Sequence, residues 1–518
     1  IKLKGFAPKQ RIPDIEDKTL DGATPDVLII GAGVVGCSIA RELSRYKLNT
    51  YLIEKENDVA MAASSRNDGD VHVGIDLKKH FQKHYYNSRG NAMFERLSEE
   101  LDFVFQRTGH AILFSTKWEK LLAPIMRLKA RQLGIKGARL LSPDKMKKYE
   151  PSIPSWCTGA FYMPTGGEIS PYKFTVALAE NAVSNGVKLF LNTIVKSMNI
   201  EGGKVCEVLT NRGVIRPRLV INAAGVFSDV IAEMADDRTF SIHPRKGTNL
   251  ILDKKVKSYA AISMGKSPFA KDKDTEVSDS KKHTKGGGVA HTVDDNVLIG
   301  PNAIETPERE DFSTDKQCID EVFNKQKKVA EKMTRADVIT YYSGIRASTY
   351  EEDFVVRKGI FTKNIIHAAG IQSPGLTAAP AIGVDVAKWA VELLGGAKEN
   401  LGFSPIRIGV PELKKLSSEE RDRYIKDNPD YGIIICRCEE ISKGEILDAL
   451  SSPIVVPTVD GIKRRVRPGM GRCQGGFCSP LVIEIIADKL GIPVEQVRKS
   501  GTQSVILFGD TKEGDREL

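Results

Sequence analysis

The sequence lacks any long uninterrupted apolar run, although hydrophobic residues make up 41% of the chain. None of its runs approaches the roughly 18 to 20 residues that a membrane-spanning helix needs. We therefore expect no transmembrane segment, while peripheral contact with a membrane stays open. The sequence starts at Ile1 rather than Met, which leaves open whether a leader precedes it. Residues 1–23 mix Glu and Asp with Lys and Arg, which is not the composition of a transit peptide.

The chain also lacks a strong charge imbalance. Its formal net charge of +9 is spread over 518 residues, and no segment interleaves Lys and Arg with aromatic residues. This pattern argues against nucleic-acid binding. A mild positive excess is better suited to a small anionic substrate or to the acidic surface of a partner. The length itself predicts two to four domains.

A disulfide framework is absent as well. Four of the eight cysteines, at positions 37, 157, 206 and 318, stand alone in the sequence. They indicate buried thiols in a reducing compartment, the cytoplasm or an organellar matrix. The other four are grouped near the C-terminus, and this grouping calls for a separate explanation.

Near the N-terminus, a βαβ unit with a glycine-rich turn stands out. The apolar run Val27–Ile30 leads into Gly31-Ala32-Gly33-Val34-Val35-Gly36, a helical pattern follows, and the strand pattern 50–53 ends at Glu54. In such a unit the glycines and the helix N-terminus approach a pyrophosphate, and the acidic residue binds a ribose. The alternative is a βαβ unit with a chance glycine triplet. The fingerprint does not distinguish NAD from FAD, but no second one follows, so a separate nicotinamide domain is not expected.

Further alternation of strands and helices predicts an α/β fold. Strand patterns end at Asn222-Ala223-Ala224-Gly225 and at Ala369-Gly370, and helices are expected over 172–185 and 375–394. A hairpin is expected at Glu201-Gly202-Gly203-Lys204. Residues 90–150 have helical spacing and are expected to cover the sheet, residues 240–340 are less regular, and residues 265–288 are expected to form a surface loop.

Together with Ser64-Ser65-Arg66-Asn67-Asp68-Gly69-Asp70-Val71-His72, these motifs resemble the D-amino-acid-oxidase/glycerol-3-phosphate-dehydrogenase superfamily of flavoproteins. Within it, the chain resembles the anaerobic glycerol-3-phosphate dehydrogenase catalytic subunits and the 2-hydroxyglutarate dehydrogenases. The resemblance implies an FAD cofactor. Its expected contacts are Gly31, Gly33, Gly36, Glu54, Ser64, Ser65, Asn67, Gly225, Gly370, Gly375, Leu376 and Thr377. A helix N-terminus at Gly375 would stabilise negative charge on the reduced flavin ring.

The four C-terminal cysteines have the spacing of a metal or iron–sulfur site. Cys436-Arg437-Cys438 is followed by Cys473-Gln474-Gly475-Gly476-Phe477-Cys478. Zinc is the alternative, although its usual pairs are C-x2-C. The segment 469–480 resembles the bacterioferritin-associated-ferredoxin-like [2Fe–2S] module, in the wider-spaced version fused to glycerol-3-phosphate dehydrogenases. Arg437 and Arg472 would help to balance the charge of a cluster, unless they are simply solvated.

Two residues are candidates for catalysis. His72 resembles the active-site histidine of the family and would act as the base, unless it is a packed or surface histidine. Arg346 resembles the arginine that binds the substrate anion, unless it forms a structural ion pair. Arg245 and Lys246 are weaker candidates. Family versions of the loop before His72 often read Asn-Ser-Gly, so the carboxylates of Asp68 and Asp70 leave the substrate uncertain.

We therefore expect a Rossmann-like FAD-binding domain with an interleaved α+β substrate domain, plus a small helical [2Fe–2S] module. The expected boundaries are an arm at 1–23, the oxidoreductase at 24–395, a linker at 396–430, the cluster module at 431–495 and a tail at 496–518. Within the oxidoreductase, the FAD-binding parts are about 24–90, 150–235 and 340–395, and the substrate or cap parts are about 91–149 and 236–339.

The predicted activity is dehydrogenation of a small anionic hydroxy compound. The first choice of substrate is sn-glycerol 3-phosphate and the second is 2-hydroxyglutarate or a similar 2-hydroxy acid. Electrons would pass from FAD through the cluster to a soluble carrier, an electron-acceptor protein or a quinone-linked partner subunit. The alternatives are an amine or imino-acid dehydrogenase within a hetero-oligomer, and a catalytically degenerate flavoprotein subunit. The Lys271–Lys285 loop is expected to be solvated, with docking of a partner or a lipid headgroup as the alternative.

Overall fold

The computed structural model describes residues 10–267 and 287–509. The chain divides into two compact units. The first contains residues 1–55 and 59–407, and the second contains residues 56–58 and 408–518. Residues 396–407 of the expected linker thus belong to the first unit, where Arg407 donates to the carboxylate of Glu180.

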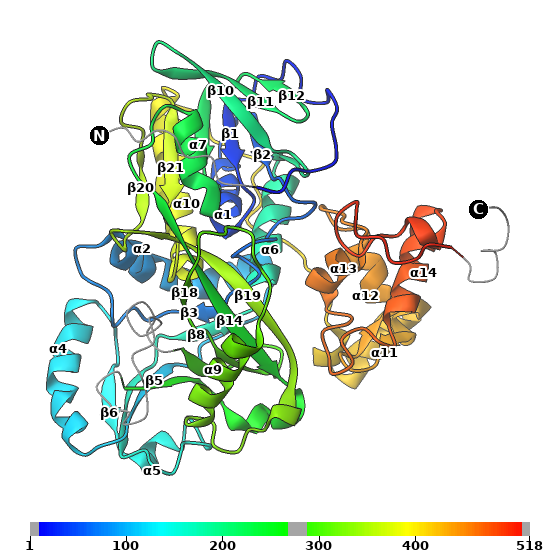
Figure 1. Cartoon of the computed structure of the whole chain (residues 1–518). Coiled ribbons are helices and arrows are strands. Elements are labelled where there is room, and N and C mark those ends of the chain that lie inside the picture. The colour runs from blue at the N-terminus through cyan, green and yellow to red at the C-terminus, as the bar shows by residue number, and fades with distance from the viewer. Residues whose placement is uncertain (1–9, 268–286, 510–518) are drawn as a thin grey trace. The chain divides into compact units, whose positions relative to one another are not determined.

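A six-stranded sheet forms one half of the first unit (Figure 1). Its order is β20-β21-β13-β1-β2-β9, and all neighbours are parallel except the edge strand β20. Its strands are β1 (Val27–Ile30), β2 (Thr50–Ile53), β9 (Lys188–Phe190), β13 (Leu219–Asn222), β20 (Val355–Lys358) and β21 (Ile365–Ala369). The predicted strands are confirmed. Near-continuous apolar residues suit strands that are covered on both faces.

Three long helices accompany this sheet: α1 (Val34–Leu43), α6 (Pro171–Ser184) and α10 (Gly375–Leu393). Each lies where the helical pattern predicted it. Helices α1 and α10 cross so closely that a Cβ on Gly383 would lie 2.8 Å from the Ser38 carbonyl oxygen. A three-stranded antiparallel sheet also belongs to this half, with β10 (Val195–Glu201), β11 (Lys204–Thr210) and β12 (Gly213–Ile215). The predicted hairpin turn joins its first two strands, with Gly202 and Gly203 both at positive φ.

A nine-stranded sheet forms the other half of the first unit. Its strands run in the order β18-β14-β17-β16-β15-β5-β7-β6, with β19 paired to β14. They are β5 (His110–Phe114), β6 (Arg139–Leu141), β7 (Gly159–Met163), β14 (Ile242–Leu252), β15 (Ser263–Lys266), β16 (Gly288–His291), β17 (Val297–Gly300), β18 (Ile304–Glu305) and β19 (Val338–Thr349). A small third sheet has the order β3-β8-β4, from β3 (Asp70–Val71), β8 (Gly167–Ile169) and β4 (Phe105–Gln106).

Two expectations for this half were incomplete. Residues 90–150 contain helices, but they also contribute β5 and β6 to the large sheet. The irregular region 240–340 contains the long strand β14, which pairs with β19 along its whole length. Pro244, Gly247 and two cations weaken the strand pattern of β14. Its cations Arg245 and Lys246 are nevertheless buried, because carboxylates pair with them.

Further helices of the first unit lie within the described residues. They are α2 (Gln82–Asn91), α3 (Phe94–Leu101), α4 (Ala123–Gln132), α5 (Pro143–Met146), α7 (Ser228–Met234) and α9 (Lys316–Lys327). Short 3-10 segments are η1 (Trp118–Leu122), η2 (Gly225–Phe227), η3 (Lys254–Tyr259) and η4 (Arg335–Asp337). Most of the expected surface loop 265–288, including Lys271–Lys285, falls outside the described residues.

The second unit is small and mostly helical, as expected. It contains α11 (Ser418–Asp427), α12 (Lys443–Ala449), α13 (Val459–Val466), α14 (Ser479–Leu490) and the strand pair β22 (Ile434–Cys436) and β23 (Ile441–Ser442). Short 3-10 segments are η5 (Leu413–Lys415), η6 (Pro429–Gly432) and η7 (Val494–Gln496). Its apolar core includes Ile446, Ile462 and Ile486, all with no exposed surface. No helix among the described residues of either unit is long and apolar enough to span a membrane.

Candidate active site and thiolate cluster

The turn between β1 and α1 needs its glycines. Gly31 has φ +104°, and a Cβ there would lie 2.5 Å from the carbonyl oxygen of Ala223, which directly follows the neighbouring strand β13. A Cβ on Gly36 would lie 1.9 Å from the Gly31 carbonyl oxygen. Glu54, just beyond β2, accepts a hydrogen bond of 2.7 Å from the backbone N–H of Ala32. The turn and the acidic residue therefore lie together, as a dinucleotide-binding turn requires.

The N-terminus of α1 is favourable for an anion. Its N-cap residue is Gly33, which has no side chain to cap the helix, and its first turn contains no acidic residue. The helix dipole is thus uncompensated by charge at this end. The backbone N–H of Val34 donates to the hydroxyl oxygen of Ser64 at 2.9 Å, so Ser64 connects the loop after β2 to this helix end.

Ser65 and Asn67 shape the loop that follows. Ser65 donates to the Ala62 carbonyl oxygen at 3.4 Å. The Asn67 amide donates to the carbonyl oxygens of two earlier loop residues and accepts from the backbone N–H of Gly69 at 2.9 Å. The Tyr342 hydroxyl donates to the Asn67 carbonyl oxygen at 2.6 Å, which fixes the loop against β19. Asp68 and the residues after it are held in place by these bonds.

Two more glycines and a helix start complete the expected flavin contacts. Gly225 follows β13 at φ +55°, and nothing lies within 4 Å of a Cβ built there, so a ligand can approach its backbone. Gly370 follows β21 at φ +65°. Gly375, Leu376 and Thr377 form the first turn of α10, which has no side-chain cap and no acidic residue. These residues fit a long anionic dinucleotide, which two helix N-termini and an open glycine can contact.

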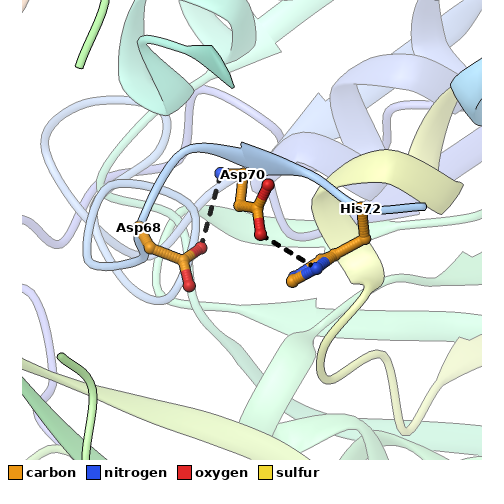
Figure 2. Close-up of side chains that lie close together, drawn as sticks. All are labelled: Asp68, Asp70 and His72. Carbon is orange, nitrogen blue, oxygen red and sulfur yellow. Dashed lines mark hydrogen bonds and ion pairs between the residues drawn. The ribbon is translucent and has the colours of Figure 1, made fainter. Parts of the chain in front are cut away.

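His72 lies beside this helix start and is held by two neighbours. Its backbone N–H donates to the Thr377 hydroxyl oxygen at 2.9 Å. Its ring Nδ1 lies 3.0 Å from Asp70 Oδ2, and its Nε2 lies 3.2 Å from the Ser373 hydroxyl oxygen. Figure 2 draws the contact between Asp70 and His72 as a dashed line. The ring is 18% exposed, so it is neither fully packed in the core nor a free surface histidine.

Asp70 has two titratable neighbours, His110 and Glu168, that the sequence interpretation missed. His110, at the start of β5, places Nε2 2.6 Å from Asp70 Oδ1. Glu168 on β8 pairs directly with Asp70 on β3, and its side chain is buried. Burial and the nearby Asp70 raise the pKa of Glu168 well above its usual range. The only sequence signal for Glu168 was an acidic residue at a buried strand position. Its contact with Asp70 depends on strand pairing, which the sequence pattern did not show.

Arg346 on β19 has no carboxylate partner within 4 Å among residues 10–267 and 287–509. Its one hydrogen bond within that part of the chain goes to the Asn302 carbonyl oxygen at 3.1 Å. The side chain is half-buried, yet burial of its guanidinium lowers the pKa of Arg346 to about 10, opposed by attraction to Asp68. By contrast, the weaker candidates are occupied: Arg245 pairs with Glu305 and Glu352, and Lys246 pairs with Asp311.

The four C-terminal cysteines lie in one place as two close pairs. Cys438 Sγ and Cys473 Sγ are 3.8 Å apart. A thiol hydrogen bond joins Cys436 to Cys478; it lowers the pKa of Cys436 to about 6, against the effect of burial. Backbone N–H groups of the segment 475–477 donate to the Cys473 sulfur. The glycine-rich flank predicted from the sequence thus directs backbone amides at the Cys473 sulfur, while Arg437 and Arg472 are exposed.

The geometry of the thiols distinguishes the two candidate metals. A tetrahedral zinc ion with Zn–S bonds of about 2.3 Å brings all four sulfurs within about 3.8 Å of one another. All four thiols lie in the described part of the chain, and no three of them fall within 4.8 Å of one another. Two pairs are what two iron ions require, since each iron of a [2Fe–2S] cluster takes two thiolates.

The comparisons with known proteins agree with this geometry. The family model described as "FAD dependent oxidoreductase" matches residues 26–389, and the "BFD-like [2Fe-2S] binding domain" matches residues 434–488. The chain is 38% identical to the glycerol 3-phosphate dehydrogenase of Caloramator mitchellensis over 489 residues, which cover 94% of this chain and 99% of the relative.

Two further similarities concern a second dehydrogenase and a solved structure. An anaerobic glycerol-3-phosphate dehydrogenase subunit from Escherichia coli is 25% identical over 508 residues, which cover 89% of this chain and 88% of the relative. The structure of dithionite-reduced L-α-glycerophosphate oxidase from Mycoplasma pneumoniae with FAD bound has a TM-score of 0.67 at 25% identity, covering 74% of this chain and 98% of that one. The chain therefore belongs to the FAD-dependent oxidoreductases: it is an enzyme with an FAD cofactor in its first unit and a [2Fe–2S] cluster in its second.

Proposed function

We propose that this enzyme oxidises sn-glycerol 3-phosphate to dihydroxyacetone phosphate and passes the electrons to its [2Fe–2S] cluster. The observation that carries the proposal is Arg346, a guanidinium without a carboxylate partner in the described residues. It attracts Asp68 electrostatically, and Asp68 lies in the same cluster as His72. A planar guanidinium suits the phosphate of this substrate. Relatives that act on glycerol 3-phosphate support the choice.

In the proposed mechanism, His72 Nε2 accepts the proton of the C2 hydroxyl while the hydride leaves the same carbon. Bound FAD supplies the two-electron acceptor for that hydride. Asp70 orients the ring through Nδ1, which leaves Nε2 facing Ser373 and the substrate side. Arg346 holds the anionic end so that the C2 carbon stays in one position. The proton and the electron pair therefore leave the substrate by separate routes.

The proposed flavin site uses the residues expected from the sequence. Gly31, Gly33, Gly36 and Glu54 would hold the adenosine diphosphate, and Ser64, Ser65 and Asn67 would lie along the cofactor. The backbone at Gly225 and Gly370, together with Gly375, Leu376 and Thr377, would contact the flavin end. The uncapped start of α10 supports this placement, because a helix N-terminus stabilises negative charge on the reduced ring.

In the second unit, Cys436, Cys438, Cys473 and Cys478 would hold the cluster through their thiolates. A bound [2Fe–2S] cluster supplies one-electron transfer. The next carrier in this proposal is an electron-acceptor protein or a quinone-linked subunit, within a hetero-oligomer. The similarity to a protein named as one subunit of a dehydrogenase supports this.

One observation favours a second candidate, oxidation of an amine or imino acid. Asp68 and Asp70 place two carboxylates beside His72. They would repel a phosphate and attract an ammonium group. A 2-hydroxy acid such as 2-hydroxyglutarate is the intermediate case, since it carries carboxylates that Arg346 would also bind.

Anaerobic reduction of the flavin separates these substrates. The holoenzyme is mixed with glycerol 3-phosphate, 2-hydroxyglutarate, sarcosine or proline, and loss of flavin absorbance is followed by stopped flow. We expect rapid bleaching by glycerol 3-phosphate, then reduction of the cluster seen by EPR. Cys473→Ser should keep the bleaching and lose the EPR signal. Bleaching by the amines alone would contradict the proposal, and bleaching by none of the four would favour a degenerate flavoprotein.

We also propose that the surface around α4 contacts an anionic lipid surface. Trp118, Leu121, Ile125 and Leu128 are 49, 78, 66 and 57% exposed, and the last three recur at helical spacing. Exposed Lys and Arg residues flank them at positions 117, 127, 129 and 131. These residues lie on the adjoining segments η1 and α4, and apolar and basic side chains combined on helical segments are typical of interfacial membrane contact. Figure 1 shows α4 at the outer edge of the first unit.

Co-sedimentation with vesicles tests this contact. We expect the holoenzyme to pellet with vesicles that contain phosphatidylserine, and less so with neutral vesicles. Leu121→Asp and Ile125→Asp should lose that binding. The control is Leu401→Asp, which changes an equally exposed leucine elsewhere in the same unit. Equal pelleting of all variants would refute the assignment of this face.

A further inference from the structure

Three potential metal ligands converge behind His72 from three different strands. Asp70 lies on β3, His110 begins β5 and Glu168 lies on β8. One ligand atom of each lies within 4.8 Å of the others. The three residues are 8, 8 and 1% exposed, so water has little access to the space between them.

Glu168 is the least satisfied member of this cluster. It pairs directly with Asp70 across two antiparallel strands, so two carboxyl groups face each other on one side of the sheet. Its Oε1 is buried and has no hydrogen-bond partner in the described protein. A buried carboxylate needs a proton, a cation or hydrogen-bond donors. The strands themselves provide none of these at Oε1.

His110 lies directly against Asp70 in this cluster. Its Nε2 lies 2.6 Å from Asp70 Oδ1, and both side chains are buried. The ring is held in place by packing, because a Cβ on Gly166 would lie 2.2 Å from it. Ligand atoms of His110, Asp70 and Glu168 thus face one buried space, where a single ion could contact all three.

We propose that Asp70, His110 and Glu168 bind a divalent transition-metal ion such as Zn²⁺ or Mn²⁺. One imidazole with two carboxylates suits these ions, whereas Mg²⁺ and Ca²⁺ prefer oxygen ligands alone. Two positive charges would balance the two facing carboxylates. The site uses Asp70 Oδ1, which leaves Oδ2 on His72 Nδ1.

The position of the ion gives it a role beside the reaction centre. Asp70 would bridge the metal and His72, an arrangement in which a carboxylate both coordinates a metal and orients a histidine. The ion would also offset the negative charge of Asp68 and Asp70, shown in Figure 2 next to His72. An anionic substrate could then approach. The metal site itself depends on no assumption about which substrate is oxidised.

Metal analysis of the holoenzyme tests this inference. The protein is loaded with Zn²⁺ or Mn²⁺, gel-filtered, and its zinc, manganese and iron are measured per chain by mass spectrometry. The cluster contributes two irons, which serve as an internal reference. We expect about one further metal ion per chain. Titration of Mn²⁺, followed by loss of the EPR signal of the free ion, gives the affinity while the oxidised cluster is EPR-silent.

Glu168→Gln keeps the shape of the side chain and removes its charge. It should weaken metal binding by at least about tenfold while retaining flavin and iron. Glu119→Gln is the matched control, since Glu119 is also fully buried and its Oε2 accepts hydrogen bonds from Ser115 and Thr116. Among the described residues Glu119 belongs to no group of potential metal ligands. If the wild-type protein contains no metal beyond its two irons, the proposal is wrong, and a proton rather than a metal ion occupies the group of Asp70, His110 and Glu168. Equal binding by Glu168→Gln would also overturn it.

If Glu168→Gln loses flavin or iron, His110→Gln replaces it in the same titration. The wild-type stoichiometry decides the question in either case.

Discussion

Replacing Arg346 by methionine tests the anion-binding role most directly. Methionine removes the charge but keeps much of the bulk. Within the described residues, Arg346 donates one hydrogen bond, to the Asn302 carbonyl oxygen, and has no ion pair. A typical internal hydrogen bond contributes about 0.5 to 1.5 kcal/mol. The loss of folding stability should therefore be small.

The loss of substrate binding should be much larger. Burial lowers the pKa of Arg346 to about 10, so the guanidinium is still protonated at neutral pH. A charged hydrogen bond contributes about 1.5 to 3 kcal/mol. Two parallel bonds to a phosphate would then contribute about 3 to 6 kcal/mol, or roughly a 10²- to 10⁴-fold change in kcat/KM.

Steady-state kinetics with glycerol 3-phosphate, beside thermal unfolding of the same samples, measures both effects. Arg346→Lys should recover part of the activity, because it restores the charge without the planar pair of donors. Arg245→Met is the matched control: it breaks ion pairs with Glu305 and Glu352, so it should lower stability. If Arg346→Met keeps kcat/KM within about threefold of wild type, the role assigned to it is wrong.

Three further changes have defined outcomes. His72→Gln should slow flavin reduction by roughly 10²- to 10⁴-fold in stopped flow, with flavin content unchanged; a normal rate would exclude it as the base. Gly31→Ala places a Cβ 2.5 Å from the Ala223 carbonyl oxygen, so the purified protein should lose its flavin absorbance, and a fully yellow variant would contradict the turn geometry. Asp237 is buried against His367. Burial alone would raise the pKa of Asp237, but hydrogen bonds from His367 and from backbone N–H groups outweigh it and lower that pKa. Its contribution to stability is therefore present above the ordinary Asp pKa of about 4 and is lost as pH falls through the lower folded value. Asp237→Asn should be about 3 kcal/mol less stable at pH 7 and should lose less stability on acidification; urea unfolding at several pH values checks both, and an unchanged pH slope would refute the reasoning.

Much of the fold could be predicted from local patterns. The βαβ unit at residues 27–53 was recognisable because its strands are continuously apolar and its turn needs glycine. The hairpin at Gly202 and Gly203 was recognisable because two glycines at positive φ form a preferred two-residue turn. The long strand β14 was missed because its buried cations look like surface residues until their carboxylate partners, distant in sequence, are in place.

The same distinction between local patterns and contacts made only after folding applies to the candidate site. His72, Arg346 and the four cysteines were named from motifs, but their surroundings were not. Strand pairing brings Glu168 opposite Asp70, and the arrangement of β5 adds His110. No local pattern contains those contacts, since the three residues are spread over about a hundred positions of the chain.

The amino-acid sequence by itself determined where the cofactors belong. Glycines at a close turn and paired thiols act through local geometry and specific chemistry, so their spacing alone carries the information. Only the tertiary structure decided which charges are already neutralised. It pairs Arg245 and Lys246 with carboxylates, leaves Arg346 without a carboxylate partner in the described chain and concentrates acids behind His72. Charge balance depends on distance and burial, and both are set by strands that meet only after folding.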